Sequence, residues 1–257
     1  MLRVAGWNMQ QKKLIINFDS MDKVTEIAKM IDHSILHPAL TDDDLKRECL
    51  IAMKYNVASV CVKPYAVKQA AKLLKGSDVL VGCVIGFPAG NSAIEVKDFE
   101  TETACRDGAV EIDMVINIGK ALQEDWAYLE KEISTVVGTS HKFGAITKVI
   151  FETDFVTNDK HKIKLCEICS KAGADYVKTS TGFGFVKGPD GKFSYTGATA
   201  HDLELMKKHS APGVKVKAAG GVRTLKDLLK YKDIGISRCG ATATAAIIEE
   251  ARILFRD

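Results

Sequence analysis

Lys178 has the setting of a reactive amine rather than that of an ordinary surface lysine. It ends a short apolar run and is followed by hydroxyl-bearing residues and a glycine, in the sequence DYVKTSTG (175–182). An apolar pocket removes water from the charged form of an amine, so the pKa falls and the neutral amine can attack a carbonyl to form a Schiff base. This run alone leaves a second interpretation open, in which Lys178 ends a strand and extends its amine into solvent.

Asp113 and Lys217 are the residues that favour the reactive interpretation. Both lie in runs that read as buried strands, EIDMVIN (111–117) and KVKAAGG (215–221). Charges inside parallel strands are costly unless they are paired or used. A second lysine would lower the pKa of Lys178 by repulsion, and an aspartate would limit the total charge and carry protons. Together the three side chains could make or break a carbon–carbon bond beside a carbonyl through an imine and an enamine.

A structural layer of charge is expected beneath these groups. Side chains alternate along a strand, so Glu111 shares a face with Asp113, and Lys215 shares a face with Lys217. Ion pairing accounts for Glu111 and Lys215 without any chemistry. We therefore predict an ion pair between Glu111 and Lys215 below the reactive layer.

Glycines near the end of the chain predict a phosphate site. Gly220 and Gly221 follow one expected strand and precede a helix, so their backbone amides could approach an anion closely. The run Gly240-Ala241-Thr242 follows the last expected strand and could supply the other half of the site. Gly182 could form a third wall.

Eight β-branched runs alternate with amphipathic stretches, and these elements must position the residues above. The pattern is typical of βα units, and eight units predict an α/β protein with a closed (β/α)8 TIM barrel. The length of 257 residues, 46% of them hydrophobic, suits a single such domain. The predicted strands are Ser34–Leu36, Ser59–Val62, Val79–Ile85, Val110–Ile116, Ala145–Phe151, Tyr176–Lys178, Val214–Ala218 and Ile236–Arg238. Helices should begin near Asp42, Tyr65, Ala93, Lys120, Asn158, Ala198, Leu225 and Thr244.

The domain should span residues 21–257, after an N-terminal extension over residues 1–20. An additional helix from about Asp22 to Met30 would precede the first strand and close the bottom of the barrel. At the opposite face, the carboxyl-terminal ends of the strands should gather the catalytic groups, as in essentially every characterised barrel enzyme. The polar residues expected there are Asp32, His33, Cys61, Lys63, Asp113, Asn117, Lys148, Glu152, Lys178, Lys217 and Thr242.

Composition limits the partners and the compartment. The chain has 36 basic and 33 acidic residues, a net charge of +3, so we expect neither nucleic acid nor a membrane surface as a partner. Seven cysteines, mostly in apolar runs, predict reduced thiols and a cytoplasmic location. The pair Cys166 and Cys169 has a metal-like spacing, but on a helix it places two small apolar groups on one face. No apolar run reaches the length of about 20 residues that spans a bilayer, and the N-terminal residues do not have the pattern of a secretory signal.

Six motifs resemble those of the deoxyribose-phosphate aldolase family, class I aldolases with a (β/α)8 barrel. They are DHSIL (32–36), SVCV (59–62), GFPAG (86–90), EIDMVIN (111–117), VKTSTG (177–182) and KAAGGVRT (217–224). The resemblance extends over nearly the whole sequence. The resemblance implies reversible cleavage of 2-deoxy-D-ribose 5-phosphate to D-glyceraldehyde 3-phosphate and acetaldehyde, in deoxyribonucleotide catabolism. It also implies that no metal or organic cofactor is needed and that the protein is a homo-oligomer, either a dimer or a tetramer.

The resemblance assigns roles to individual residues. Lys178 would form the Schiff base, while Lys217 would lower the pKa of Lys178 and join Asp113 in a proton relay through an ordered water. The residues that would hold the substrate or its phosphate are Asp32, Cys61, Lys148, Thr181, Gly182, Gly220, Gly221, Gly240 and Thr242.

Two positions depart from the family pattern. His37 stands where a lysine is common, and Thr242-Ala243 stands where a pair of serines is common. A missing neutral hydrogen bond costs about 0.5–1.5 kcal/mol, so we expect weaker phosphate affinity rather than a loss of chemistry.

Two other functions remain open at this point. His33 and His37 alternate onto one strand face and could share a metal ion in a metal-dependent aldolase, although Pro38 ends the strand and no carboxylate-rich ligand set accompanies them. Alternatively, the barrel could be a binding or scaffold protein without catalysis, for which the altered residues Thr242-Ala243 are the only support.

Overall fold

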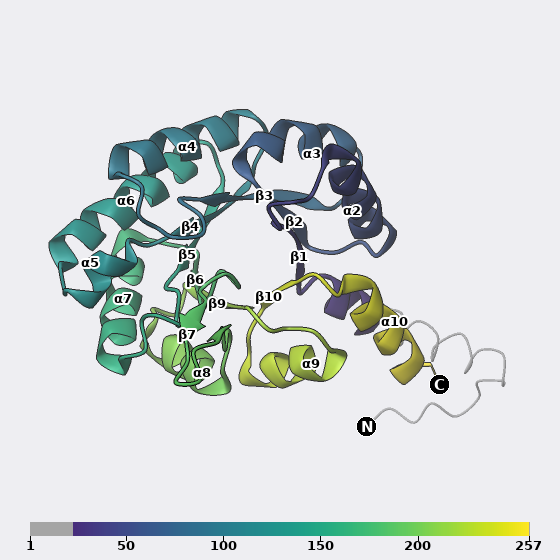
Figure 1. Cartoon of the computed structure of the whole chain (residues 1–257). Coiled ribbons are helices and arrows are strands. Elements are labelled where there is room, and N and C mark those ends of the chain that lie inside the picture. Colours follow the sequence, from purple (N-terminus) through teal and green to yellow (C-terminus); the bar gives the residue numbers. More distant parts are fainter. Residues whose placement is uncertain (1–22, 257) are drawn as a thin grey trace, which may run out of the picture.

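The computed structural model describes residues 23–256, and these form a closed parallel barrel ringed by helices (Figure 1). Around the barrel the strand order is β1-β10-β9-β6-β5-β4-β3-β2. The barrel strands are β1 (Ile31–Ile35), β2 (Ser59–Val62), β3 (Leu80–Ile85), β4 (Glu111–Val115), β5 (Ile146–Ile150), β6 (Tyr176–Lys178), β9 (Lys215–Ala219) and β10 (Arg238–Ala241). The predicted (β/α)8 TIM barrel is therefore confirmed.

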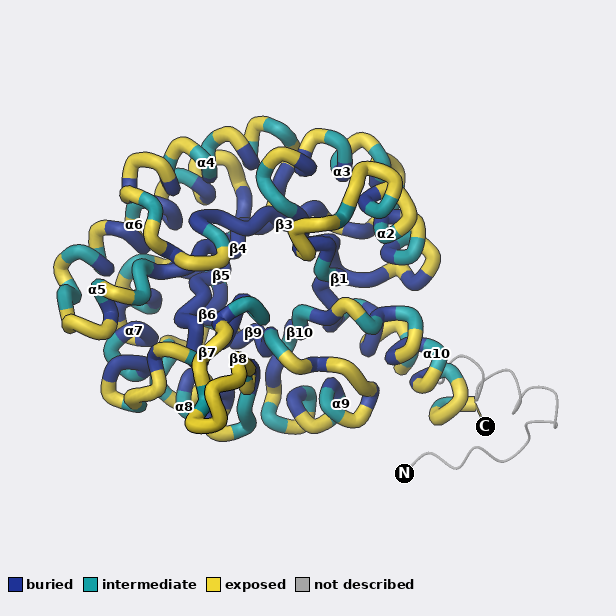
Figure 2. The backbone as a smooth tube through the Cα atoms, in the orientation of Figure 1, coloured by how far each residue is buried: buried dark blue, intermediate teal, exposed yellow. Residues whose placement is uncertain are grey.

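Helices on the outside of the barrel cover the strands. The barrel strands are almost wholly buried, whereas the helices have a buried inner side and an exposed outer side (Figure 2). The helices are α2 (Asp42–Lys54), η1 (Pro64–Ala66), α3 (Val67–Leu73), α4 (Ile94–Arg106), α5 (Ile118–Leu122), α6 (Trp126–Lys142), α7 (Asp159–Ala172), α8 (Ala200–His209), α9 (Leu225–Ile234) and α10 (Thr244–Leu254). No helix in the described part of the chain is long and apolar enough to cross a membrane.

Local sequence signals explain where several helices begin and end. Thr41 and Thr224 form capping boxes at the starts of α2 and α9, which satisfy free backbone amides at these helix ends. Gly173 and Gly235 adopt the left-handed conformation that ends α7 and α9. The starts expected at Asp42, Leu225 and Thr244 are thus found as predicted.

The amino-terminal helix occupies residues 23–28, within the range expected from Asp22 to Met30. Asp22 lies outside the described residues, as does the predicted extension over residues 1–20. The domain boundary at residue 21 therefore stays a prediction.

Two strands differ from the predicted ranges in a way that matters for the site. β1 begins three residues earlier than expected, because Asp32 and His33 interrupt the apolar pattern yet are buried at 0% and 1% exposure. β10 begins at Arg238, two residues later than expected, and pairs Arg238 with Lys217 of β9. The polar side chains of Asp32 and Arg238 thereby become part of the barrel.

A hairpin outside the barrel was not predicted. Strands β7 (Val186–Lys187) and β8 (Phe193–Ser194) pair antiparallel between β6 and α8. The stretch expected to be one helix near Lys120 is also divided, because Glu124 has a positive φ of 62° and Asp125 caps a new helix, α6.

Candidate active site

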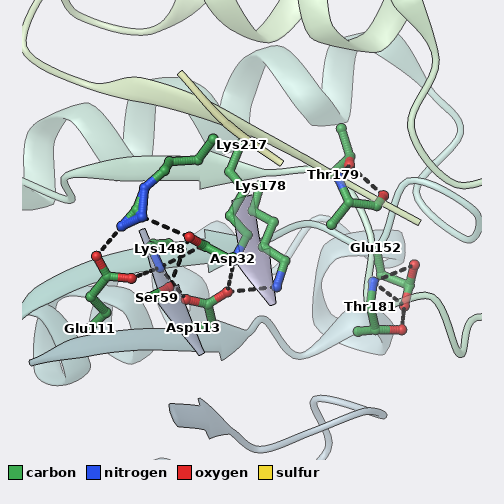
Figure 3. Close-up of polar contacts among 12 residues, drawn as sticks. Asp32, Ser59, Glu111, Asp113, Lys148, Glu152, Lys178, Thr179, Thr181 and Lys217 are labelled. Atoms are coloured by element: carbon green, nitrogen blue, oxygen red, sulfur yellow. Dashed lines mark hydrogen bonds and ion pairs between the residues drawn. The ribbon is translucent and has the colours of Figure 1, made fainter. Parts of the chain in front are cut away.

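Lys178, Asp113 and Lys217 meet inside the barrel, as Figure 3 shows. Asp113 Oδ2 lies 2.6 Å from Lys178 Nζ and 2.7 Å from Lys217 Nζ. β6 and β9 are neighbours whose register places Lys178 beside Lys217. The three side chains are at most 4% exposed. The predicted convergence of these residues is confirmed, and the interpretation of Lys178 as a solvent-facing lysine is wrong.

The surroundings shift the pKa values of Lys178 and Lys217 in opposite directions. Burial lowers the pKa of Lys178; the Asp113 carboxylate opposes this shift and the Lys217 ammonium adds to it. For Lys217, burial would lower the pKa, but the carboxylates of Asp113 and Asp32 outweigh it, so the pKa is raised. The lysines also hold the pKa of Asp113 well below its usual range despite its burial. Lys178 is thus the lysine in this group that gives up a proton most easily.

A second group of charges lies alongside and is tied to the first by Asp32. Asp32 Oδ2 is 2.5 Å from Lys217 Nζ and 3.0 Å from Lys148 Nζ, and Ser59 donates a hydrogen bond to Asp32 Oδ1 at 2.9 Å. Lys148 Nζ also lies 2.5 Å from Glu111 Oε2 and 3.0 Å from Asp113 Oδ1. The charged residues of the two groups therefore form one continuous buried network.

The predicted ion pair between Glu111 and Lys215 is wrong. Lys215 is the first residue of β9, and its side chain is exposed beside the Tyr176 ring, with Nζ 5.8 Å from the ring centroid. Glu111 instead contacts Lys148 and the guanidinium of Arg238. Lys215 lies at the amino-terminal end of β9, opposite the cavity, and there its side chain reaches solvent instead of the interior.

A cavity of about 300 Å³ opens above Lys178 and Lys217. Most of the predicted site residues line this cavity: Asp32, Cys61, Lys178, Thr181, Gly182, Lys217, Gly220, Gly221, Gly240 and Thr242. Asp113 and Lys148 do not line it, since both are buried beneath, at 0% and 1% exposure. A molecule in the cavity could therefore contact Lys178 directly, whereas Lys148 would act on it only through other side chains.

Glycine backbone forms much of the cavity wall. Gly182, Gly220 and Gly221 have φ values of 82°, 86° and 80°, a region that other residues rarely adopt. A Cβ atom on Gly220 would come within 2.9 Å of Gly197 Cα. Gly220 lies in the loop that leads from β9 into α9, and Gly240 lies near the end of β10, shortly before α10; helix amino termini favour anions. This wall has the form expected of a phosphate site.

The hairpin contributes an aromatic wall that was missed from the sequence. Phe185 and Tyr195, which flank the hairpin, line the cavity and pack edge to face with ring centroids 5.4 Å apart. Arg223 Nη2 donates a hydrogen bond to the Tyr195 hydroxyl at 3.3 Å. The turn sequence Gly-Pro-Asp-Gly at 188–191, between two aromatic stretches, was the available signal for this hairpin.

Glu152 holds the loop that follows Lys178. It lies in the left-handed region with φ of 56°, and its buried carboxylate accepts hydrogen bonds from the Thr181 amide at 3.2 Å and from the Thr181 hydroxyl. Burial raises the pKa of Glu152. Glu152 was expected at this face, and its role in supporting Thr181 appears only in the structure.

The two histidines of the metal alternative point to different places. His33 is buried, with Nδ1 2.7 Å from Thr244 Oγ1 and Nε2 3.0 Å from Glu48 Oε2, so it packs between β1 and the surrounding helices. His37 lines the cavity instead. Because the imidazoles do not converge, their geometry gives no support to a shared metal ion.

The cysteines are free thiols, as predicted. Cys61 lies in the cavity wall, where burial raises its pKa to about 11. Cys166 and Cys169 are both buried in α7. Cys61 is therefore a neutral wall residue at physiological pH.

Comparisons with known proteins agree with this geometry. The sequence model described as DeoC/LacD family aldolase matches residues 26–245. The chain is 48% identical over 229 residues to a deoxyribose-phosphate aldolase of Clostridium perfringens, covering 89% of this chain and 96% of that protein. It is 46% identical over 227 residues to a deoxyribose-phosphate aldolase of Rhodopirellula baltica, covering 88% and 90%.

A solved structure is also similar over most of its length. The tetrameric deoxyribose phosphate aldolase from Aeropyrum pernix superposes with a TM-score of 0.79 at 27% identity, covering 93% of this chain and 97% of that one. The sequence match and the shared barrel lead to one conclusion: this chain belongs to the DeoC/LacD family of aldolases.

Proposed function

We propose that this protein is a deoxyribose-phosphate aldolase, which reversibly cleaves 2-deoxy-D-ribose 5-phosphate to D-glyceraldehyde 3-phosphate and acetaldehyde. The observation that carries the proposal is the amine of Lys178, buried against Asp113 and open to a cavity walled by glycines. The similarity to curated relatives that have this name supports the choice of substrate.

Lys178 is the nucleophile in this proposal. Its neutral amine adds to the C1 aldehyde of the open-chain sugar, and loss of water gives an iminium ion. The C2–C3 bond then breaks as the C3 hydroxyl loses its proton, which releases glyceraldehyde 3-phosphate and leaves an enamine on Lys178. Protonation at C2 and hydrolysis release acetaldehyde and regenerate the amine.

Asp113 and Lys217 affect the charge of the Lys178 amine and can exchange protons near it. Lys217 disfavours the charged form of Lys178 by repulsion, and Asp113 Oδ2 lies between the two lysine nitrogens, at 2.6 and 2.7 Å. Lys217 lines the cavity and is therefore positioned to exchange protons with the reacting atoms, whereas Asp113 lies beneath it and would exchange protons through these lysines or a water.

Binding of the substrate is assigned to the cavity wall. Backbone amides of Gly182, Gly220, Gly221 and Gly240, with the Thr242 hydroxyl, would bind the phosphate. Asp32, Cys61 and Thr181 also line the cavity, as Lys178 does. Lys148 is assigned a supporting role, because it reaches the substrate only through Asp32 and Asp113.

Borohydride reduction in the presence of acetaldehyde tests the nucleophile and the chemistry together. Mass spectrometry of the digested protein should find an ethyl group on Lys178. Lys178→Leu should abolish both this adduct and retro-aldol turnover, while Lys230→Leu, a change on α9, should retain both. An adduct at another lysine, or turnover that survives Lys178→Leu, would refute the assignment.

The assembly and the compartment are also proposals. We propose a homo-oligomer, a dimer or tetramer, in line with the tetramer named for the Aeropyrum pernix relative. Light scattering coupled to size exclusion would test this, and a monomeric mass would refute it. The free cysteines support a reducing, cytoplasmic location, which fluorescence microscopy of a tagged chain would test.

A further inference from the structure

Arg238 is a buried cation with no part in the reaction described above. It enters the barrel from β10 at 7% exposure and does not line the cavity. Its guanidinium lies 2.7 Å from Asp32 Oδ1 and also contacts the carboxylate of Glu111. Since Asp32 also contacts Lys217 at 2.5 Å, Arg238 is connected to the reactive lysines through shared carboxylates.

The connected residues form a charge cluster with unequal numbers of acids and bases. Its members are the acids Asp32, Glu111 and Asp113 and the bases Lys148, Lys178, Lys217 and Arg238. With every member ionised, the buried cluster would carry one uncompensated positive charge. Such a charge is costly in a desolvated interior, so the cluster is most stable when one base is neutral.

The contacts decide which base is neutral. Arginine stays protonated in proteins, which leaves the three lysines. Lys148 contacts three carboxylates, at 2.5, 3.0 and 3.0 Å, and Lys217 contacts two, at 2.5 and 2.7 Å. Among residues 23–256, Lys178 contacts only one carboxylate, that of Asp113 at 2.6 Å. Lys178 therefore loses the least electrostatic stabilisation when it gives up its proton.

We propose that Arg238 is a positioning residue that keeps Lys178 in its neutral form. The guanidinium of Arg238 neutralises carboxylate charge in the cluster that would otherwise stabilise a third lysine ammonium group, that of Lys178. Without Arg238, three carboxylates would face three lysines, and Lys178 would keep its proton. The inference rests on the proposed function, because a neutral amine matters only if Lys178 is the nucleophile.

The test measures kcat/KM for 2-deoxyribose 5-phosphate against pH in the wild-type protein and four variants. In Arg238→Gln the acid limb should move up by roughly one pH unit, since one cation has been removed. In Glu111→Gln it should move down, because one anion has been removed. The double variant keeps the balance and should return to the wild-type limb, and Arg252→Gln, a surface arginine paired with Glu249 at 2.9 Å, should not change it.

The outcomes distinguish an electrostatic role of Arg238 from a merely structural one. If the acid limb of the pH profile moves in neither single variant, the proposal is overturned, whatever their kcat. A merely structural role would lower activity without shifting this limb. If Arg238→Gln does not fold, the decision rests on a limb lowered in Glu111→Gln and restored in the double variant. Borohydride trapping of wild type is measured first; without an adduct at Lys178 the proposed function itself fails, whereas an adduct with unmoved limbs overturns only the role of Arg238.

Discussion

The interior of the barrel and the mouth of the cavity stabilise charge with different groups. In the interior, ionised side chains contact one another, and Asp113, Lys178 and Lys217 are at most 4% exposed. At the mouth, the glycine loops offer backbone amides, and the side chain of Arg223 is exposed. Burial makes the interior sensitive to single charges, whereas the mouth should tolerate changes in side chains but not in backbone conformation.

Among changes that keep Lys178, the largest effect is expected for Lys217→Leu in the interior. Removal of this ammonium group removes repulsion, so the pKa of Lys178 should rise and the neutral amine become scarcer at neutral pH. Turnover should fall by at least about 100-fold, and the acid limb of the pH–rate profile should move to higher pH. Circular dichroism should show a retained fold. An unchanged pH–rate profile would contradict the role assigned to Lys217.

Gly220→Ala should give the next largest effect and tests the backbone of the mouth. A side chain at φ of 86° costs about 1–3 kcal/mol, and the new Cβ would lie 2.9 Å from Gly197 Cα. KM for 2-deoxyribose 5-phosphate should rise by roughly 10-fold or more, with a smaller change for unphosphorylated 2-deoxyribose. Gly213→Ala is the matched control, because its Cβ would meet no atom of the described part of the chain within 4 Å. Equal losses on both sugars would argue against a phosphate site here.

Ala243→Ser should produce a smaller gain at the mouth. Ala243 caps α10 without a side-chain hydrogen bond, next to the cavity residue Thr242. An added hydroxyl is expected to contribute about 0.5–1.5 kcal/mol, so affinity for the phosphorylated sugar should increase roughly 2- to 10-fold. Steady-state kinetics with both sugars would measure this. A lowered KM for unphosphorylated 2-deoxyribose as well would indicate an effect other than phosphate binding.

Tyr195→Phe should have the smallest effect. The Tyr195 hydroxyl accepts a 3.3 Å hydrogen bond from the exposed Arg223, and exposed polar contacts contribute little. We expect KM for the phosphorylated sugar to rise about 2-fold, with kcat unchanged. Tyr65→Phe, at an exposed tyrosine elsewhere, should leave both constants unchanged. A loss of kcat in Tyr195→Phe would show that the hairpin affects chemistry rather than binding.

Much of the fold was predictable because its signals are local. The strands Ser59–Val62 and Tyr176–Lys178 were found with the predicted bounds, since each is a short β-branched or apolar run between polar segments. β1 was misplaced because Asp32 and His33 look unsuitable for a buried strand until their partners are known. Local propensity carries no information about partners more than 100 positions away.

The site was predicted to the extent that alternation along a strand decides which side chains point inward. This rule brought Asp113, Lys178 and Lys217 together correctly, but it also paired Glu111 with Lys215. The prediction for Lys215 fails because alternation gives the face of the sheet on which a side chain lies, and not its height along the barrel axis.

From the sequence alone one could predict the barrel, the place of Lys178 at the end of a strand and the glycines that follow the strands, because strand periodicity and residue type are local properties. The tertiary structure was needed to show that Arg238 enters the charge cluster and that Lys148 lies beneath the cavity. Which carboxylates each base contacts depends on the register and stagger of strands that are distant in sequence. The protonation state of Lys178 follows from those contacts, because in a desolvated interior the total charge of the neighbours decides which group stays neutral.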